Sequence, residues 1–94
     1  YKTYDFPTGK VQFSSFPGLP FSGDDWFITS NRLMVTETTN DIFNMSLYKY
    51  LTPQTVPYWI RVQVANTATT GPEWHQLFGM NNNGGYNNQW MVVD

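Results

Sequence analysis

The sequence predicts an α+β fold in which two helices cover antiparallel strands. Segments that are rich in β-branched and aromatic residues, or that alternate apolar and polar residues, lie within residues 11–39 and again at residues 89–93. Two segments with apolar residues at helical spacing lie between them, and a link short enough for a hairpin joins two of the early strands. Strands and helices that are grouped in this way are typical of α+β proteins.

The N-terminal part contains one predicted strand. Residues 1–9 include a proline and a glycine, and we expect them to form an irregular lead-in. Residues 11–16 begin with apolar and polar residues in alternation, which predicts a short strand. Residues 17–20 hold two prolines and a glycine that end this strand, and residues 22–25 are expected to form a polar turn.

A β-hairpin is predicted next. Residues 26–29 and 33–39 are rich in β-branched and aromatic residues, and Ser30-Asn31 lies between them. Asparagine tolerates the positive φ that primed turns in two-residue hairpin loops require. We therefore expect the two segments to form an antiparallel pair.

The first helix is predicted to start at Thr52-Pro53, because threonine is a good N-cap and proline fits the first helical position. Residues 56, 59, 60, 63 and 64 then recur at helical spacing, and four of these five are apolar. Pro57 falls in the second turn and is expected to bend the helix or to shift its start.

The second helix is expected at Pro72–Phe78. Thr70 is a candidate N-cap, and Glu73, three residues later, completes a capping box. Gly79 is expected to end the helix.

A loop and a final strand complete the predicted elements. Residues 80–86 include three asparagines and two glycines, which favours a loop. Residues 89–93 are expected to form a buried strand that is cut off at Asp94. A strand interrupted in this way predicts an internal segment of a larger domain.

The composition also indicates a segment that other parts of a protein cover. The 94 residues include four tryptophans, six tyrosines and seven phenylalanines, and 13% are charged, against roughly 25% in average soluble domains. Small domains usually depend on disulfides, metals or partner chains. The sequence has no cysteine, and His75 is its one histidine, so a disulfide and a Cys/His zinc site are excluded. We therefore expect residues 1–94 to be one segment of a larger domain, covered by the remaining segments of the same protein.

Charge and hydropathy exclude two further classes of function. The formal net charge is −2 and no run of basic residues occurs, which argues against binding of nucleic acid. The longest apolar runs span only a few residues, so no transmembrane segment is expected. The polar start lacks the apolar region of a signal peptide and fits a processed or truncated chain.

Two polar clusters are candidates for a functional site. Residues 36–40, Thr-Glu-Thr-Thr-Asn, lie at the end of a predicted strand, where side chains can project into a pocket from a rigid scaffold. Residues 84–90, Gly-Gly-Tyr-Asn-Asn-Gln-Trp, combine flexible backbone with amide groups that can stabilise an oxyanion. Each cluster can equally be structural, because such residues also end strands and satisfy loop backbone.

Other polar residues have simpler interpretations. His75 lies beside Trp74 in an amphipathic helix, which favours a surface or packing role. Asp24 and Asp25 are adjacent at the entry to a strand and so point to opposite faces, which favours turn and cap residues over an acid/base pair. Asn44-Met45-Ser46 is an N-glycosylation sequon, and its use requires Asn44 to face solvent.

Four parts of the sequence occur in an order that matches one known family. They are residues 13–18 with 24–27 (Phe-Ser-Ser-Phe-Pro-Gly and Asp-Asp-Trp-Phe), 37–40 (Glu-Thr-Thr-Asn), 59–66 (Trp-Ile-Arg-Val-Gln-Val-Ala-Asn) and 85–94 (Gly-Tyr-Asn-Asn-Gln-Trp-Met-Val-Val-Asp). Together they resemble the phospholipase B-like family, also called the laminin ancestor family. The last segment is the most specific, and the resemblance covers nearly the whole chain.

The resemblance implies an N-terminal nucleophile hydrolase with a four-layer αββα sandwich, of which this chain is an internal fragment. In that family an autoproteolytic cut exposes a cysteine whose thiol attacks an ester or amide carbonyl. That cysteine, and the histidine and tryptophan soon after it, would precede Tyr1. The resemblance further implies a lysosomal or secreted glycoprotein that deacylates phospholipids and needs no metal or cofactor.

The resemblance also implies roles for particular residues. Thr38 and Thr39 match its Thr-Thr segment and are expected to support catalysis without being nucleophiles, and Asn40 is expected to bind substrate beside them. Asn87 and Asn88 are weaker substrate-binding candidates, since their motif can also be structural. A cysteine whose own α-amine acts as base needs nearby polar groups to orient that amine and to hold the oxyanion. Asn44 is the expected site of glycosylation.

The predicted function is therefore that of a segment of an acyl hydrolase acting on phospholipids or on amides. One alternative is a non-catalytic carbohydrate- or lipid-binding module of a secreted protein, and another is a relative that acts structurally or carries a ligand. The hydrolase interpretation predicts that Trp26, Trp59 and Trp90 are mostly buried. A binding module predicts that several of these rings are aligned and exposed.

Overall fold

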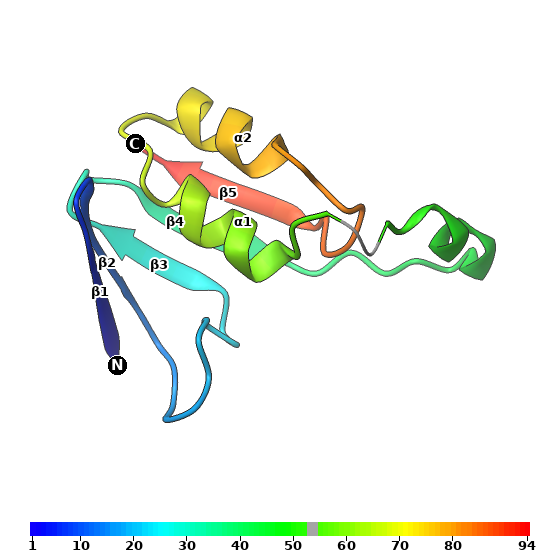
Figure 1. Cartoon of the computed structure of the whole chain (residues 1–94), viewed down its shortest axis with the longest axis horizontal. Helices are drawn as coiled ribbons and strands as arrows, with labels where there is room; N and C mark the ends of the chain where they lie inside the picture. Colours follow the sequence, from blue (N-terminus) through cyan, green and yellow to red (C-terminus); the bar gives the residue numbers. More distant parts are fainter. Residues whose placement is uncertain (53–54) are drawn as a thin grey trace.

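The computed structural model describes residues 1–52 and 55–94, and one antiparallel sheet with two helices on one face forms its body (Figure 1). The strand order follows the sequence: β1 (Lys2–Phe6), β2 (Gly9–Phe13), β3 (Trp26–Thr29), β4 (Met34–Thr38) and β5 (Gln89–Val93). Between β4 and β5 the chain forms a short 3-10 helix, η1 (Met45–Tyr50), and the helices α1 (Tyr58–Ala65) and α2 (Gly71–Gly79). The prediction of an α+β fold is confirmed.

β1 shows that the prediction of an irregular N-terminus was wrong. Tyr4 and Phe6 are half-buried against the core, and the residues next to them are exposed, as in a strand with one covered face. Pro7 and Thr8 form the two-residue loop of a hairpin in which Phe6 lies opposite Gly9. The proline and glycine in this segment therefore mark a tight turn between strands.

β2 starts and ends earlier than the predicted strand. It ends at Phe13 because the next two side chains bind loop groups. The hydroxyl of Ser14 donates to the carboxylate of Asp24 at 2.5 Å, and that of Ser15 donates to the carbonyl of Phe21 at 2.8 Å.

The β3–β4 hairpin is confirmed, with a loop one residue longer than predicted. Phe27 lies opposite Val35, a register that leaves three residues in the loop. The positive φ is adopted by Arg32, at 69°, and not by Asn31. In three-residue hairpin loops the third residue commonly adopts the left-handed conformation. The Asn31 side chain instead donates to the carbonyl of Ala68 at 3.0 Å and ties the hairpin to the α1–α2 link.

α1 begins at Tyr58, directly after Pro57, which is its N-cap residue. The predicted start at Thr52-Pro53 is not observed: Thr52 is not helical, and Pro53 lies outside the described residues. A proline inside a helix would remove a backbone hydrogen bond, so the helix starts after it. The predicted apolar face was also wrong, because the buried residues are Arg61, Val62 and Ala65, and Val64 is 44% exposed.

α2 confirms the predicted second helix and its N-cap. The Thr70 hydroxyl accepts from the backbone amide of Glu73 at 3.3 Å. The Glu73 carboxylate accepts from the amide of Thr69 at 2.8 Å, one residue before the partner that a capping box predicts.

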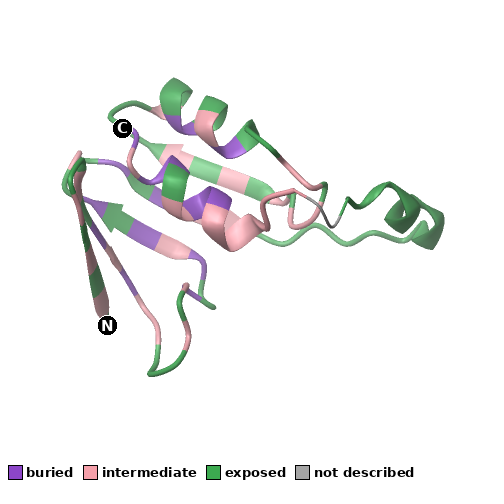
Figure 2. Cartoon of the chain, in the orientation of Figure 1, coloured by how far each residue is buried: buried purple, intermediate pink, exposed green. Residues whose placement is uncertain are grey.

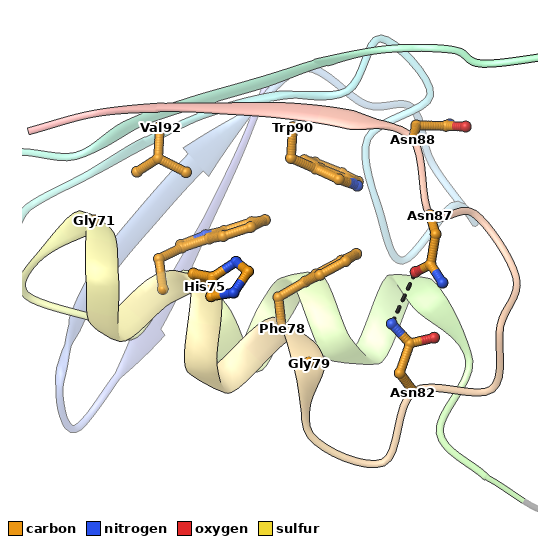
Figure 3. Close-up of a pocket in the computed structure, with 10 residues that line it drawn as sticks. Gly71, His75, Phe78, Gly79, Asn82, Asn87, Asn88, Trp90 and Val92 are labelled. Carbon is orange, nitrogen blue, oxygen red and sulfur yellow. Dashed lines mark hydrogen bonds between the residues drawn. The ribbon is translucent and has the colours of Figure 1, made fainter.

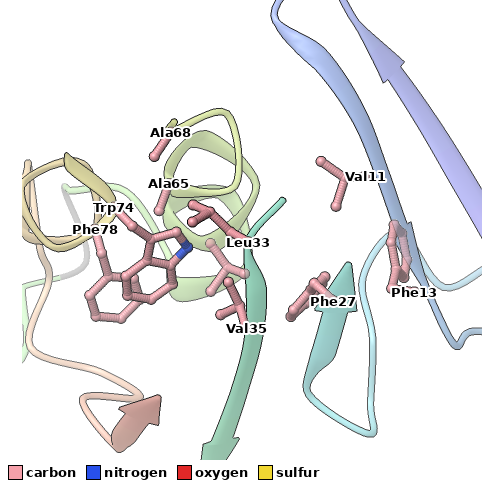
Figure 4. Packing of buried hydrophobic residues seen from close by; sticks show 10 residues of the cluster. Val11, Phe13, Phe27, Leu33, Val35, Ala65, Ala68, Trp74 and Phe78 are labelled. Atoms are coloured by element: carbon pink, nitrogen blue, oxygen red, sulfur yellow. The ribbon is translucent and has the colours of Figure 1, made fainter. Parts of the chain in front are cut away.

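The core lies between the sheet and the two helices (Figures 2 and 4). Trp74 and Phe78 of α2 stack with ring centroids 5.0 Å apart, and Trp90 of β5 packs against both rings. The buried apolar residues are Val11, Phe13, Phe27, Leu33, Val35, Val62, Ala65, Ala68, Trp74 and Phe78. Both helices and all five strands contribute to this core, β1 and β5 through half-buried residues. Residues 41–51, which carry η1 and are called the arm below, are exposed.

The opposite face of the sheet is apolar and uncovered in this chain. Ile28, Met34, Met91 and Val93 lie on it and are 43–55% exposed. β5 has the predicted bounds, but it is not the buried strand that was expected, since only Trp90 and Val92 are half-buried.

The tryptophans are less buried than the hydrolase interpretation predicted, and none is fully exposed. Trp74 is buried, whereas Trp26, Trp59 and Trp90 are half-buried. Trp26 contacts Tyr1 at a centroid distance of 6.0 Å, and Trp59 stacks on Phe21 at 6.4 Å. The rings do not form the aligned, exposed row that a binding module would present.

Candidate functional site

The residues that follow β4, the arm (residues 41–51) and the loop before β5 line a cavity of ≈ 550 Å³. Four of the five predicted catalytic and substrate-binding residues line it, namely Thr39, Asn40, Asn87 and Asn88. Thr38 does not line it: this residue pairs with Gln89 and lies on the sheet face that points away from the helices. Apolar side chains of the arm form the facing wall.

A direct contact joins the two polar clusters. The backbone amide of Asn40 donates to Oδ1 of Asn88 at 3.2 Å. Nδ2 of Asn88 is buried and has no hydrogen-bond partner among the described residues. A buried amide donor without a partner costs free energy, and among the five predicted site residues only Asn88 carries such a side-chain group in the described part of the chain.

Arg61 holds the loop that carries the two asparagines. Its side chain is 1% exposed, and its Nη2 donates to the carbonyl of Gly85 at 2.5 Å and to Oδ1 of Asn83 at 3.4 Å. Nη1 lies 3.4 Å from Oδ1 of Asn87, and the guanidinium lies 4.6 Å from the Phe78 ring. Burial lowers the pKa of Arg61 from its ordinary value. A buried cation needs such acceptors, and by taking them Arg61 fixes the loop.

A second cavity, of ≈ 510 Å³, lies between α2 and β5 and shares Asn87 and Asn88 with the first (Figure 3). The rings of Phe78 and Trp90 line it, and Nδ2 of Asn82 donates to Oδ1 of Asn87 at 2.8 Å across one end. His75 lies on its exposed side, which agrees with the surface role that was predicted for it.

Asp25, Glu37 and Tyr86, to which the sequence assigned no catalytic or binding role of their own, form an acidic cluster beside the first cavity. The Tyr86 hydroxyl donates to Oδ2 of Asp25 and lies 3.2 Å from Oε1 of Glu37. Burial raises the pKa of Asp25 to about 6, and it also raises the pKa of Tyr86. The Tyr86 ring stacks on Tyr58 of α1 at a centroid distance of 3.9 Å.

The cluster contacts the candidate site directly. Oγ1 of Thr39 donates to Oε1 of Glu37 at 3.4 Å, and Tyr86 itself lines the cavity next to Asn87. Asp25 had been expected to be a turn or cap residue, yet its side chain is buried against Glu37, while Asp24 stays exposed. The correct register of the β3–β4 hairpin would have predicted this cluster, because it places Asp25 beside Glu37.

The sequon residue Asn44 is exposed and is the N-cap residue of η1. Its Oδ1 accepts from the amide of Ser46 at 3.1 Å and from the Ser46 hydroxyl at 2.7 Å. The side chain thus caps the 3-10 helix from a position that solvent reaches.

In residues 1–52 and 55–94, no three His, Cys, Asp or Glu side chains gather as metal ligands would. No helix in the same part of the chain is long and apolar enough to cross a membrane. The polar groups that the first cavity offers are hydroxyls, amides and one carboxylate, from Asp41.

Comparison with known proteins identifies the family. A family model described as Phospholipase B matches residues 1–94. Phospholipase B-like protein G of Dictyostelium discoideum is 51% identical over 86 residues, which are 90% of this chain and 14% of that protein. Phospholipase B-like 1 of Rattus norvegicus is 44% identical, and phospholipase B of Crotalus adamanteus 42% identical, each over 102 residues that cover 100% of this chain and 18% of the relative. The chain spans less than a fifth of the length of these relatives, and over that span it belongs to the phospholipase B family.

Proposed function

We propose that this chain is a segment of an acyl hydrolase that deacylates phospholipids or cleaves amides. The nucleophile in this proposal is an N-terminal cysteine in a part of the protein outside this chain. The observation that carries the proposal is that Thr39, Asn40, Asn87 and Asn88 line one cavity. The names of the relatives, which are phospholipase B or phospholipase B-like proteins, support the substrate class.

The polar groups of the cavity have the chemistry that such a centre requires. When a thiolate attacks an acyl carbonyl, negative charge develops on the carbonyl oxygen, and nearby donors stabilise it. Nδ2 of Asn88 is a buried donor without a partner among the described residues. We assign oxyanion or substrate binding to Asn88, substrate binding to Asn40 and Asn87, and orientation of the nucleophile's amine to Thr39 and Thr38. Thr38 reaches the centre from the other face of β4 in this proposal.

The remaining segments of the same protein are proposed to cover the open face of the sheet as the second sheet of an αββα sandwich. Ile28, Met34, Met91 and Val93 form an apolar surface there, and burying such side chains releases roughly 25 cal/mol per Å². This surface supports the view that residues 1–94 are one segment of a larger domain.

We further propose that the protein is lysosomal or secreted and carries a glycan on Asn44. The sequon places a hydroxyl residue, Ser46, at the required position, and Asn44 is exposed. N-glycosylation takes place in the secretory pathway, so a glycan on Asn44 would establish that the protein passes through this pathway.

The proposal is tested on the full-length protein with a phospholipid and with an amide that carries the same acyl chain. Thr39→Val and Asn88→Ala should lower kcat for the preferred substrate by at least tenfold. Thr3→Val and Gln76→Ala remove an exposed hydroxyl and an exposed amide far from the cavity, and should leave kcat within twofold. Absence of hydrolysis of both substrates by a folded, fully processed protein would overturn the proposal.

The binding-module alternative gains no support from the tryptophans, since none of the four is exposed. A relative that acts structurally or carries a ligand differs from the hydrolase in one observable, which is turnover. The same assay therefore distinguishes the hydrolase hypothesis from that of a structural or ligand-carrying relative.

A further inference from the structure

Two carboxylates meet beside the β3–β4 pair, Glu37 within β4 and Asp25 directly before β3. In the β3–β4 register Trp26 pairs with Thr36, so that Asp25 and Glu37 are the next pair along, and the Glu37 amide donates to the Asp25 carbonyl at 3.1 Å. Side chains that are opposite in a sheet share a face, and like charges in such a pair destabilise it. Glu37 shares the helix-covered face with Val35, and Asp25 is brought to the same side by its contact with Tyr86, whose ring stacks on Tyr58 of α1.

The surroundings of this pair contain donors and further negative charge, and among the described residues no Lys, Arg or His side chain forms an ion pair with either carboxylate. Asp25 is 6% exposed, and Asp24 adjoins it in the chain. The phenol of Tyr86, from the loop before β5, contacts both carboxylates, and Tyr58 of α1 stacks on the Tyr86 ring. The only ion pair in the described part of the chain is that of Lys10 with Asp5, in the β1–β2 hairpin. Arg61, the cation of α1, directs its Nη groups to neutral oxygens of the Asn83–Asn87 loop and to the carbonyl of Phe78.

One bridging hydroxyl cannot satisfy two ionised carboxylates at once. The Tyr86 hydroxyl has a single proton, and it contacts both Asp25 and Glu37. A phenol can donate to one carboxylate and accept from a protonated carboxyl group, so the geometry is fully satisfied when the pair holds one proton. The proton that completes this bridge lies on Oε1 of Glu37, the atom 3.2 Å from the Tyr86 hydroxyl. Oε2 of Glu37 is buried and has no partner in the described residues, so an ionised Glu37 would leave part of its charge unsatisfied. Two carboxylates that share a site take up a proton more readily than either does alone.

We propose that Asp25 and Glu37 share one proton and act, through Tyr86 and Thr39, as positioning residues for the site of the proposed hydrolase. This inference rests on the proposed function, because the groups that it positions are the ones assigned there. Glu37 accepts from the Thr39 hydroxyl at 3.4 Å, and Tyr86 precedes Asn87 in the chain and lines the same cavity. The pair therefore connects Thr39, directly after β4, to Asn87, in the loop before β5, on the two sides of the cavity.

Loss of the shared proton has a predictable effect. The pKa of Asp25, raised by burial to about 6, marks the pH at which the pair becomes doubly ionised. Above that pH the two charges repel each other, and Tyr86 can hold only one of them. We expect Thr39 and the Asn87 segment to lose their fixed positions, so that turnover falls as the pH rises through this range.

The test measures kcat and KM of the full-length protein from pH 4 to pH 9. Asp25→Asn keeps the shape of the side chain and supplies a permanent donor, so the alkaline fall of kcat should move up by at least one pH unit. Glu37→Gln removes the other member of the pair and should act in the same way, and it serves if Asp25→Asn does not fold. Asp24→Asn removes an equal charge from the exposed neighbour and should leave the fall in place within half a unit.

A second readout does not depend on turnover. The infrared band of a protonated carboxyl group should be present in the wild-type protein at pH 5, vanish above pH 7, and be missing at pH 5 in Asp25→Asn. A hydrolase without this band, or one whose alkaline fall is unchanged in Asp25→Asn and in Glu37→Gln, overturns the inference and leaves the proposed function intact. A protein that shows the band but hydrolyses no acyl substrate overturns the proposed function, and with it the positioning role.

Discussion

The backbone amide of Asn40 donates to Oδ1 of Asn88 at 3.2 Å and joins two segments that are 48 residues apart. The contact closes one end of the cavity, because Asn40 follows β4 and Asn88 precedes β5. It uses the acceptor of the Asn88 side chain and leaves the donor, Nδ2, without a partner in the described residues.

Asn88→Ala removes both the contact and the donor. If Nδ2 stabilises an oxyanion, kcat should fall by about 10²-fold, the usual effect of losing one such donor. Steady-state kinetics of the full-length protein checks this, with KM expected to change by less than threefold. A higher KM with kcat unchanged would contradict the oxyanion assignment and leave a role in substrate binding.

Arg61→Lys should destabilise the loop before β5. Lysine keeps the charge but lacks the planar fork that reaches Asn83, Gly85 and Asn87 together, so partly buried oxygens of this loop lose a donor. Each buried group left unsatisfied costs about 1–3 kcal/mol, and the melting temperature of the full-length protein should fall by several degrees. Arg32→Lys, at an exposed position of the β3–β4 loop, is the matched control. Equal melting temperatures for the two variants would show that Arg61 does not organise the loop.

Stability should depend on pH through Asp25. Its pKa is raised from 3.8 to about 6, so the folded protein binds a proton more tightly than the unfolded chain does between these values. The free energy of unfolding should therefore decrease as the pH rises from about 4 to about 6, and this contribution should be flat above pH 6. Thermal unfolding of wild type and Asp25→Asn across pH 4–8 measures it. The difference between the two melting temperatures should change within that window, and a constant difference would be the contrary result.

Asn44 should carry a glycan in the protein from its natural secretory route. Asn44→Gln and Ser46→Ala both destroy the sequon, and each should lower the intact mass by one N-glycan. Asn44→Gln also removes the cap of η1, whereas Ser46→Ala keeps Asn44. Unchanged glycan mass in both variants would show that the site is not used.

Residues 1–94 expressed alone should not give a cooperatively folded monomer. The exposed apolar face with Ile28, Met34, Met91 and Val93 would favour association when nothing covers it. Analytical ultracentrifugation with a thermal melt monitors both properties. A soluble monomer with a sharp melt would contradict the view that this is one segment of a larger domain.

The sequence predicted the larger elements because their signals are local. Thr70 caps α2 through a contact three residues away, and residues 89–93 form a strand with the predicted bounds. β1 was missed because its alternation is short and its turn residues suggested irregular structure. The start of α1 was missed because proline fits both at a first helical position and just before one, and the sequence offered Pro53 as well as Pro57.

The site was predictable in part, and a single residue of register explains what was missed. Thr39, Asn40, Asn87 and Asn88 carry their own polar signal. A two-residue loop at Ser30-Asn31 would have placed Asp25 opposite Thr36, whereas the observed three-residue loop places it opposite Glu37. The Asp25–Glu37 pair and its link to Tyr86 therefore depended on a loop length that local propensity does not determine.

The central claim is that this segment lines the acyl-transfer centre of a cysteine hydrolase, and trapping of the acyl-enzyme tests it most directly. The full-length, processed protein is mixed with an activated ester, quenched within one turnover, and analysed by peptide mass. We predict that the acyl group is found on a cysteine that cleavage of the protein, outside this segment, has made N-terminal. The acyl group should form at least tenfold more slowly in Asn88→Ala and Thr39→Val than in Gln76→Ala. Acylation at another residue, or at equal rates in all three variants, would contradict the claim.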